Sequence, residues 1–468
     1  MTNSTRVLCA ALAATFAAGG CTLAPNFKLP GLPVPNAWTA ASANTEGPEA
    51  AELSWGDYFA DARLRQVIEL ALENNRDLRV AALNIERARA MYRIQRADLA
   101  PSLDARGGQS AQGVPESISQ LPSGDSYITR QYNATVAAAW ELDFFGRVRS
   151  LNAQALESYL ATGEAQRSAR ISLVAAVANA WLALAADNEL LDLARQTFET
   201  QQKSVELIQR SFDAGAASAL DLAQARTAME RARADTARYT SQLARDRNAL
   251  ALLAGTAISE NLQASTLADA LSTVADLPAG VPSEVLTRRP DVLQAEHLLR
   301  AANANIGAAR AAFFPSISLT SSLGTVSTSL DDLFSSGTRM WTFAPTITVP
   351  IFHAGALRAN LERSEIERNI QVAQYEKAVQ SAFREVADAL AERATISEQL
   401  DARHALVKAA NESYRLSEAR YRSGLDSHLA LLDAQRSQYA AEQELIGTRL
   451  AEASNRVEIY KVLGGGWK

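Results

Sequence analysis

The chain is poor in the residues on which much enzyme and metal chemistry depends. Its 468 residues include two cysteines and four histidines, and the histidines show no spacing typical of metal ligands. Cys9 lies in an N-terminal segment that we expect to be removed, so the remaining Cys21 cannot form a disulfide within its own chain. No nucleophile elbow or phosphate-binding loop is recognisable. The sequence therefore predicts no catalytic residue, no metal site and no non-covalent cofactor.

A strong charge of one sign and long apolar runs are also lacking. The net charge is −6 at pH 7, which leaves no basic footprint for a nucleic-acid partner. After residue 20 no run of about 18 apolar residues occurs, so we expect no membrane-spanning helix. Apolar residues nevertheless make up 47% of the chain and aromatic residues 6%, which is ample for a folded core and reflects alanine-rich helical patterns.

The N-terminus has the pattern of a secretory signal. Residues 1–20 place Arg6 before an apolar run that ends in small residues, and Cys21 follows directly. This predicts a bacterial lipobox with a lipid on Cys21, although Ala18 stands where leucine is usual. Ordinary cleavage beside an incidental cysteine is the alternative. Acyl chains would anchor the protein strongly, and the absence of aspartate after the cysteine resembles lipoproteins of the outer membrane.

Two long stretches carry a helical apolar rhythm. Residues 356–423 contain neither glycine nor proline, and a helix of that length would measure about 100 Å. The ladder of this stretch includes His404, which we therefore expect to be packed or satisfied rather than catalytic. Residues 147–214 repeat apolar side chains at steps of three and four, with a second line beside the first (Val174, Ala178, Trp181, Ala185). Two seams fit a tube of helices, whereas the heptads alone favour an elongated coiled coil of two or three strands.

The chain is a tandem repeat. Three glycines recur 209 residues later, as Gly146 and Gly355, Gly215 and Gly424, and Gly255 and Gly464. Upstream the offset is 214, which places a length difference in the loop-rich segment before Gly146. We predict an N-terminal arm at 21–61, a first copy at 62–254, a connecting segment at 255–290, a second copy at 291–463 and a tail at 464–468.

Each copy contains a β-hairpin, at about residues 102–143 and 316–351. Apolar and small polar residues alternate there with a period of two, which is typical of half-buried strands. The strand lengths fit transmembrane strands, and Trp140 and Trp341 are available for the membrane interfaces. Two hairpins packed on a helical domain are the alternative.

A spanning sheet has to close, because every backbone group inside a bilayer must be paired. One chain supplies four strands, so two chains would give eight and three would give twelve. A water-filled passage continuous with a tube of helices favours twelve.

Several motifs resemble the outer-membrane factors of tripartite efflux pumps, in the lipidated OprM/NodT branch of the TolC-like proteins. The resemblance covers the chain from Cys21 onward, and its motifs are NNRDL, WELDFFG, LPAGVPSEVLTRRPDV, GAAR, FPS, YRSG and LLDAQR, which begin at Asn74, Trp140, Leu277, Gly307, Phe314, Tyr421 and Leu431. It implies a mainly helical chain with transmembrane strands, assembled as a homotrimer. A twelve-stranded barrel would continue into a twelve-helix periplasmic tunnel, with a mixed α/β belt around it.

The resemblance also implies passive conduction of drugs or toxic compounds out of the cell. Energy would come from an inner-membrane transporter, joined through a periplasmic adaptor that docks on the helix tips. The glycine turns place these tips at Gly215 and Gly424, with Ser218 as the cap in the first copy and Asp426 or Ser427 in the second. In the second copy, the positions that narrow the periplasmic aperture in this family are Leu429, Asp433 and Arg436, whereas an exposed ion pair on a helix face is the plainer interpretation of the last two.

A second class of protein, one that links membranes without conducting, shares part of this sequence pattern. A periplasmic adaptor or coiled-coil tether would also contain long helices and would link membranes without conducting. Such an adaptor is expected to have one helical hairpin between β-rich domains, whereas this chain has two copies, each with its own amphipathic hairpin. The sequence therefore favours the channel, located in the outer membrane and extending into the periplasm.

Overall fold

The computed structural model describes residues 22–35, 38, 53–118, 126–264, 266–267 and 283–465. The predicted signal at 1–20 and the lipidation site Cys21 lie outside these residues. The chain forms two compact units, each built from segments of both predicted copies. One unit contains the residues up to Pro30 with 85–162 and 295–375, and the other contains 31–84, 163–294 and 376–468.

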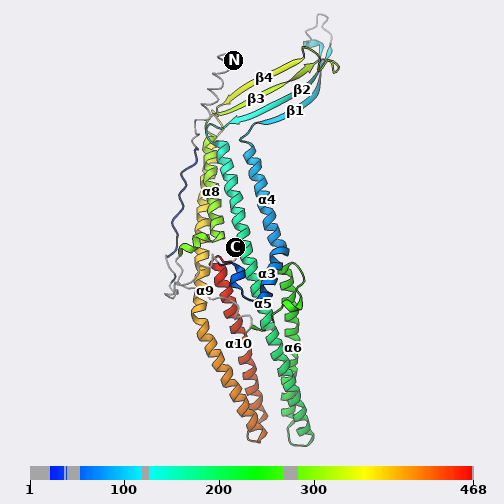
Figure 1. Ribbon diagram of the computed structural model, residues 1–468, viewed down its shortest axis with the longest axis vertical. Helices are drawn as coiled ribbons and strands as arrows, with labels where there is room; N and C mark the ends of the chain where they lie inside the picture. Colours follow the sequence, from blue (N-terminus) through cyan, green and yellow to red (C-terminus); the bar gives the residue numbers. More distant parts are fainter. Residues whose placement is uncertain are drawn as a thin grey trace. The chain divides into compact units, whose positions relative to one another are not determined.

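The chain is mainly helical, with four strands (Figure 1). Short 3-10 segments lie at Glu116–Ile118, Glu260–Leu262 and Ser283–Arg288. The α-helices are α2 (Trp55–Tyr58), α3 (Ala62–Asn74), α4 (Arg76–Ala97), α5 (Arg147–Asp213), α6 (Ala219–Ala254), α8 (Pro290–Ala311), α9 (Ala356–Arg422) and α10 (His428–Val462). The strands are β1 (Ser102–Val114), β2 (Tyr127–Leu142), β3 (Ser316–Ser327) and β4 (Arg339–Thr348).

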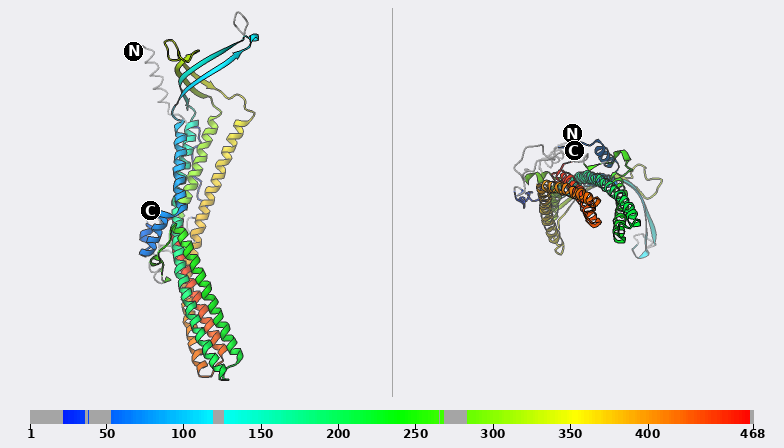
Figure 2. Two further views of the ribbon diagram at one scale, coloured as in Figure 1. Left: turned by 90° about the vertical axis from the view of Figure 1, so that its right-hand side faces the viewer. Right: turned by 90° about the horizontal axis from the view of Figure 1, so that it is seen from below.

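The two long helices occur where the apolar rhythm predicts them. Both α5 and α9 contain 67 residues. The second line of α5 is buried along its length, and its Trp181 donates a hydrogen bond from Nε1 to the carbonyl of Leu262 at 2.9 Å. The helix therefore has packing partners on both seams. At its far end α5 lies beside α6, where Ile208, Leu222 and Ala225 form a buried cluster (Figures 1 and 2).

The first long helical segment of the chain is divided into α3 and α4 at Asn75. The backbone of this residue is extended, with ψ at 129°. Its side chain accepts a hydrogen bond from the amide of Leu78 and donates one to the carbonyl of Leu253 at 2.9 Å. The loop at Gly255 approaches the same backbone so closely that a Cβ there would lie 2.3 Å from the carbonyl oxygen of Asn74. Tertiary contact therefore sets this helix boundary.

The four strands form one antiparallel sheet in chain order, within a single compact unit (Figure 2). The register brings Val136 of β2 opposite Leu323 of β3, and Leu323 opposite Trp341 of β4. Because side chains alternate along every strand, this alignment keeps the apolar positions of all four strands on one face.

One helix contains a stretch that is apolar enough to span a membrane, although the sequence predicts no membrane-spanning helix. By length and composition α5 is apolar enough to cross a membrane, but more than half of its most apolar stretch is buried within the structure. Burial of this kind is typical of a core helix that packs against its neighbours.

Candidate functional site

The first candidate site is the sheet, whose two faces differ sharply. One face carries large apolar side chains that are exposed in the chain, and Trp341 is 70% exposed. Its members include Leu103, Val136, Leu323, Trp341, Phe343 and Ile347. The opposite face carries small polar or charged side chains, including Asp104, Arg106, Thr135, Ser318, Thr320, Ser322, Thr342 and Thr346. A continuous apolar patch of this extent marks a surface that contacts lipid or protein.

Both edges of this sheet are open. Within the described residues, β1 pairs only with β2 and β4 pairs only with β3. Each outer strand therefore has a row of backbone groups available for pairing with another strand. A sheet with one apolar face and two open edges can close only by adding strands from elsewhere.

The two tryptophans predicted for the membrane interfaces lie at different levels of the sheet, because Trp140 is opposite Leu319 of β3 and Trp341 is opposite Leu323. Trp140 is close to the end of β2 that leads into α5, and its Nε1 donates to the carbonyl of Leu99 at 3.2 Å. Trp341 is close to the start of β4, at the end that connects to β3. Both belong to the apolar face by register.

The first helix tip joins α5 to α6 through a tight turn at Gly215, which has a φ of 75°. Ser218 then caps α6 in a full capping box, because its hydroxyl accepts from the amide of Asp221 and its own amide donates to the Asp221 carboxylate. Hydrogen bonds from Ser218 hold the pKa of Asp221 below its usual value, against a small opposing effect of burial. The turn and cap are those that the sequence predicts for this tip.

The second tip joins α9 to α10 at Gly424, whose φ is 70°. Its cap is weaker, since the hydroxyl of Ser427 accepts from the amide of Ala430 at 3.4 Å without a reciprocal bond. A side-chain pair strengthens the turn instead, because the guanidinium of Arg420 donates two hydrogen bonds to the carboxylate of Asp426, at 2.7 and 2.8 Å. This pair lowers the pKa of Asp426 and raises that of Arg420.

The three residues expected at the aperture lie on the first turns of α10. Leu429 is 51% exposed, and Arg436 contacts Asp433 at 3.3 Å from Nη2 to Oδ1. Leu429 and Arg436 line a groove of about 420 Å³ between α6 and α10. The same groove contains their counterparts from the first copy, Leu220, Gln224 and Thr227. The groove therefore brings together two corresponding pairs, Leu220 with Leu429 and Thr227 with Arg436, whereas Asp433, the counterpart of Gln224, is exposed and is not among the residues that line it.

Polar contacts that the sequence reasoning missed connect the two helical hairpins. The hydroxyl of Tyr439 on α10 lies 3.4 Å from the carboxylate of Asp235 on α6. Gln201 on α5 donates to Gln435 on α10 at 2.9 Å. Burial and the nearby carboxylate raise the pKa of Tyr439, so this phenol stays protonated. The seven-residue apolar repeat predicts that each long helix packs against another helix. It does not identify that helix, and these polar pairs can be predicted only once the neighbouring helix is known.

The histidines differ in their surroundings. His404, expected from its ladder to be packed or satisfied rather than catalytic, is exposed on α9 in the single chain. The buried histidine is His428, the first residue of α10, which is 3% exposed. Its ring lies 5.5 Å from that of Tyr421 between centroids.

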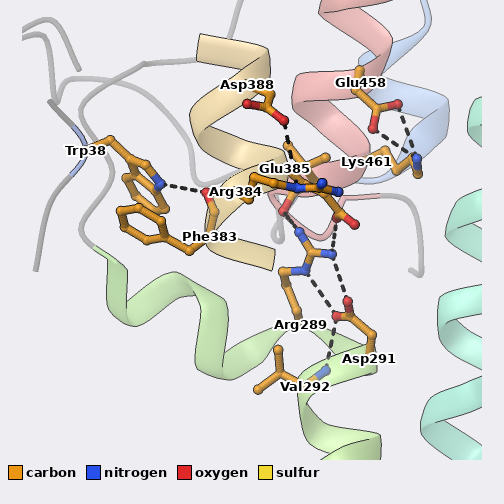
Figure 3. A network of polar contacts seen from close by, with 11 residues as sticks. Trp38, Arg289, Asp291, Val292, Phe383, Arg384, Glu385, Asp388, Glu458 and Lys461 are labelled. Carbon is orange, nitrogen blue, oxygen red and sulfur yellow. Dashed lines mark hydrogen bonds and ion pairs between the residues drawn. The ribbon is translucent and has the colours of Figure 1, made fainter. Parts of the chain in front are cut away.

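A buried arginine connects the parts of the chain that meet near its C-terminus (Figure 3). Arg289 is 8% exposed and lies directly before α8. Its guanidinium donates two hydrogen bonds to Asp291, at 3.0 and 2.8 Å, and one to Glu385 on α9 at 2.7 Å. It also donates to the carbonyl of Val462 at the end of α10, at 2.8 Å. The two carboxylates raise the pKa of Arg289 despite its burial.

The residues that follow Cys21 are docked on the helices below the sheet. Asn303 of α8 donates to the carbonyl of Pro25 at 2.9 Å, and the hydroxyls of Thr22 and Ser150 lie 3.4 Å apart. Gly307 makes this approach possible, because a Cβ there would lie 2.8 Å from the amide nitrogen of Ala24. The first described residues of the arm, 22–30, therefore belong to the same unit as the sheet.

Comparison with known proteins shows which family this architecture belongs to. Residues 67–256 and 281–465 match the family model "Outer membrane efflux protein". The chain belongs to the outer membrane efflux protein family. It is 50% identical to the toluene efflux pump outer membrane protein TtgC of Pseudomonas putida, over 99% of this chain and 96% of the relative. It is 44% identical to the outer membrane protein OprJ of Pseudomonas aeruginosa, over 96% of this chain and 94% of that protein.

The fold of the family is shared as well. The open-state crystal structure of the MtrE outer membrane channel of Neisseria gonorrhoeae is similar, with a TM-score of 0.85 and 40% identity, covering 96% of this chain and 99% of that one. This outer membrane efflux protein is accordingly the outer-membrane channel of an efflux pump. It is a transport protein and not an enzyme. The predictions of fold class, family, function and location are thereby confirmed.

Proposed function

We propose that three copies of this chain close a twelve-stranded barrel in the outer membrane. The observation that carries the proposal is a four-stranded sheet with two open edges, in which the strand register places the apolar residues of all four strands on the same face. Pairing β4 of one copy with β1 of the next satisfies both edges, turns the apolar face toward lipid and turns the polar face toward water. Three copies give a lumen wide enough for an aqueous passage.

The helices of the same unit support assembly with identical copies. Apolar side chains are exposed at helical spacing on α4 (Met91, Ile94) and on α9 (Ile366, Ile370). Two different apolar stripes on one chain suit a head-to-tail contact, which closes into a ring when the rotation allows it. The same rotation would continue the barrel as a tube of twelve helices.

The channel conducts passively in this proposal. An inner-membrane transporter supplies the energy, and a periplasmic adaptor binds the tips at Gly215, Ser218, Gly424 and Ser427. Relatives whose names refer to toluene or antibiotic efflux support small apolar or amphiphilic cargo. A lumen lined by small polar side chains would discriminate little among such compounds.

We also assign the narrow periplasmic end to Leu429, Asp433 and Arg436. In a trimer each becomes a ring of three. The ring of Asp433 is repulsive by itself, and Arg436 at 3.3 Å offsets that repulsion. The exposed Leu429 ring adds an apolar constriction that resists wetting.

A lipid on Cys21 and membrane-interface roles for Trp140 and Trp341 complete the assignment. The docked arm supports the lipid, because Thr22 directly after Cys21 lies beside Ser150 near the start of α5. The predicted two-copy domain division is retained. Its support is that all six repeat glycines adopt positive φ, between 69° and 85°.

The test uses the purified full chain in detergent and in planar bilayers. Native mass spectrometry is expected to give a mass of three chains with bound acyl groups, and bilayers are expected to show stepwise ion currents. A folded monomer that passes no ions would overturn the barrel and favour the competing role of a tether between membranes. A Cys21→Ser variant is expected to lack the acyl mass.

A further inference from the structure

His428 stands out among the titratable groups of the helix tips. It is buried, and neither ring nitrogen has a hydrogen-bond partner among the described residues. Buried polar groups are normally satisfied, so an imidazole with two unpaired nitrogens requires a reason. The start of α6 in the first copy is near enough for the charge of Asp221 to act on the ring.

None of the groups around His428 accepts a hydrogen bond from its ring, so a proton added to the ring would have no hydrogen-bond acceptor among the described residues. Tyr421 faces it from α9 with its ring, and Asp221 faces it from α6. One oxygen of the Asp221 carboxylate, Oδ2, accepts hydrogen bonds from both the amide and the hydroxyl of Ser218, at 3.0 and 2.6 Å, and neither carboxylate oxygen is hydrogen-bonded to the His428 ring. Asp426 in the preceding turn is engaged by Arg420. A protonated His428 would therefore be a buried cation held by long-range attraction alone.

We propose that His428 is a proton-binding site through which acidification loosens the contact between the two helix tips of one chain. In the neutral state the ring packs against Tyr421 of its own hairpin and stays buried beside the start of α6. In the protonated state the imidazolium gains hydration only when the tips separate. The consequence for conduction rests on the channel proposed above, in which separation of the tips widens the periplasmic end.

The direction of the pH effect follows from burial. Burial lowers the pKa of His428 below its ordinary value of 6.5, and Asp221 opposes this only in part. In separated tips water reaches the ring, so the pKa returns toward 6.5 and the separated form binds the proton more tightly. The contact is thus at full strength above about pH 6.5 and weakens as the pH falls toward the lowered pKa. For each unit by which the pKa of His428 in the closed tips lies below its pKa in the separated tips, full protonation raises the ratio of separated to closed tips by up to about tenfold per chain.

The test compares three full-length proteins in planar bilayers between pH 7.5 and 5.0. The unmodified channel is expected to gain conductance as the pH falls below about 6.5. His428→Phe keeps an aromatic contact with Tyr421 but cannot titrate, so its conductance is expected to stay constant. His404→Gln removes an exposed histidine of α9 and is expected to behave like the unmodified protein. A pH-independent unmodified channel, or a rise that persists in His428→Phe, overturns the proposal.

Hydrogen–deuterium exchange separates this inference from the proposed channel. Peptides from 205–225 and 415–435 are expected to exchange faster at pH 5.5 than at pH 7.5, after correction for the intrinsic pH dependence, in the unmodified protein only. This result without any ion current would contradict the channel and support the proton site. Ion currents with unchanged exchange at both tips would support the channel and contradict the proton site.

Discussion

Replacing Arg289 with methionine tests whether one buried guanidinium holds together the segments that meet in Figure 3. The change keeps the aliphatic stem but removes two hydrogen bonds to Asp291 and one to Glu385. It also leaves the buried carbonyl of Val462 without this donor. An unsatisfied buried acceptor costs about 1–3 kcal/mol. The two carboxylates are each roughly one-third exposed, so the loss of their countercharge adds only about 1 kcal/mol after solvent screening.

The expected destabilisation is about 3 kcal/mol, which corresponds to roughly hundredfold faster local opening. Hydrogen–deuterium exchange of peptides around Glu385 and Val462 measures it, and Arg289→Lys is expected to give an intermediate effect because lysine keeps the charge without the planar fork. Arg384→Met is the matched control, since its side chain is 74% exposed and its contact with Asp388 is 3.9 Å long. It should change exchange by less than about threefold. Equal exchange in Arg289→Met and Arg384→Met would refute the reasoning.

Three further predictions concern the tips, the aperture and the arm. Asp433→Ala combined with Arg436→Ala is expected to raise single-channel conductance, and an unchanged conductance would remove these residues from the aperture. Ser218→Ala should destabilise the start of α6 by about 1 kcal/mol in exchange measurements, because a full capping box is lost, and Ser427→Ala should have a smaller effect at α10 because its cap is longer. Gly307→Leu should displace the arm, because even its Cβ would lie 2.6 Å from the hydroxyl oxygen of Ser150. Limited proteolysis should then cut the arm faster, and an unchanged cleavage rate would argue against this packing.

Local periodicity explains why much of the fold could be predicted. The length of α9 follows from a stretch free of glycine and proline, and the strands follow from alternation with a period of two. The glycines at the two tips could be identified because a tight turn with positive φ favours that residue. The repeat then supplied each assignment twice. These features depend on residues close together in the sequence.

The features that escaped prediction depend on contacts between distant segments. The helix boundary at Asn75 requires the carbonyl of Leu253, 178 residues away in the chain. His404 and His428 both occur in helical segments, and only the packing of neighbouring helices decides which of them is buried. Arg289 stands within a motif that indicated the family, but its role depends on Glu385 and on the end of α10.

Cryo-electron microscopy of the purified full chain in lipid nanodiscs tests the central claim most directly. We predict a threefold ring in which β4 of each copy pairs with β1 of the next and the apolar sheet faces contact the lipid. A particle in which β1 and β4 pair within one chain, or in which the sheets lie outside the lipid, would contradict the account.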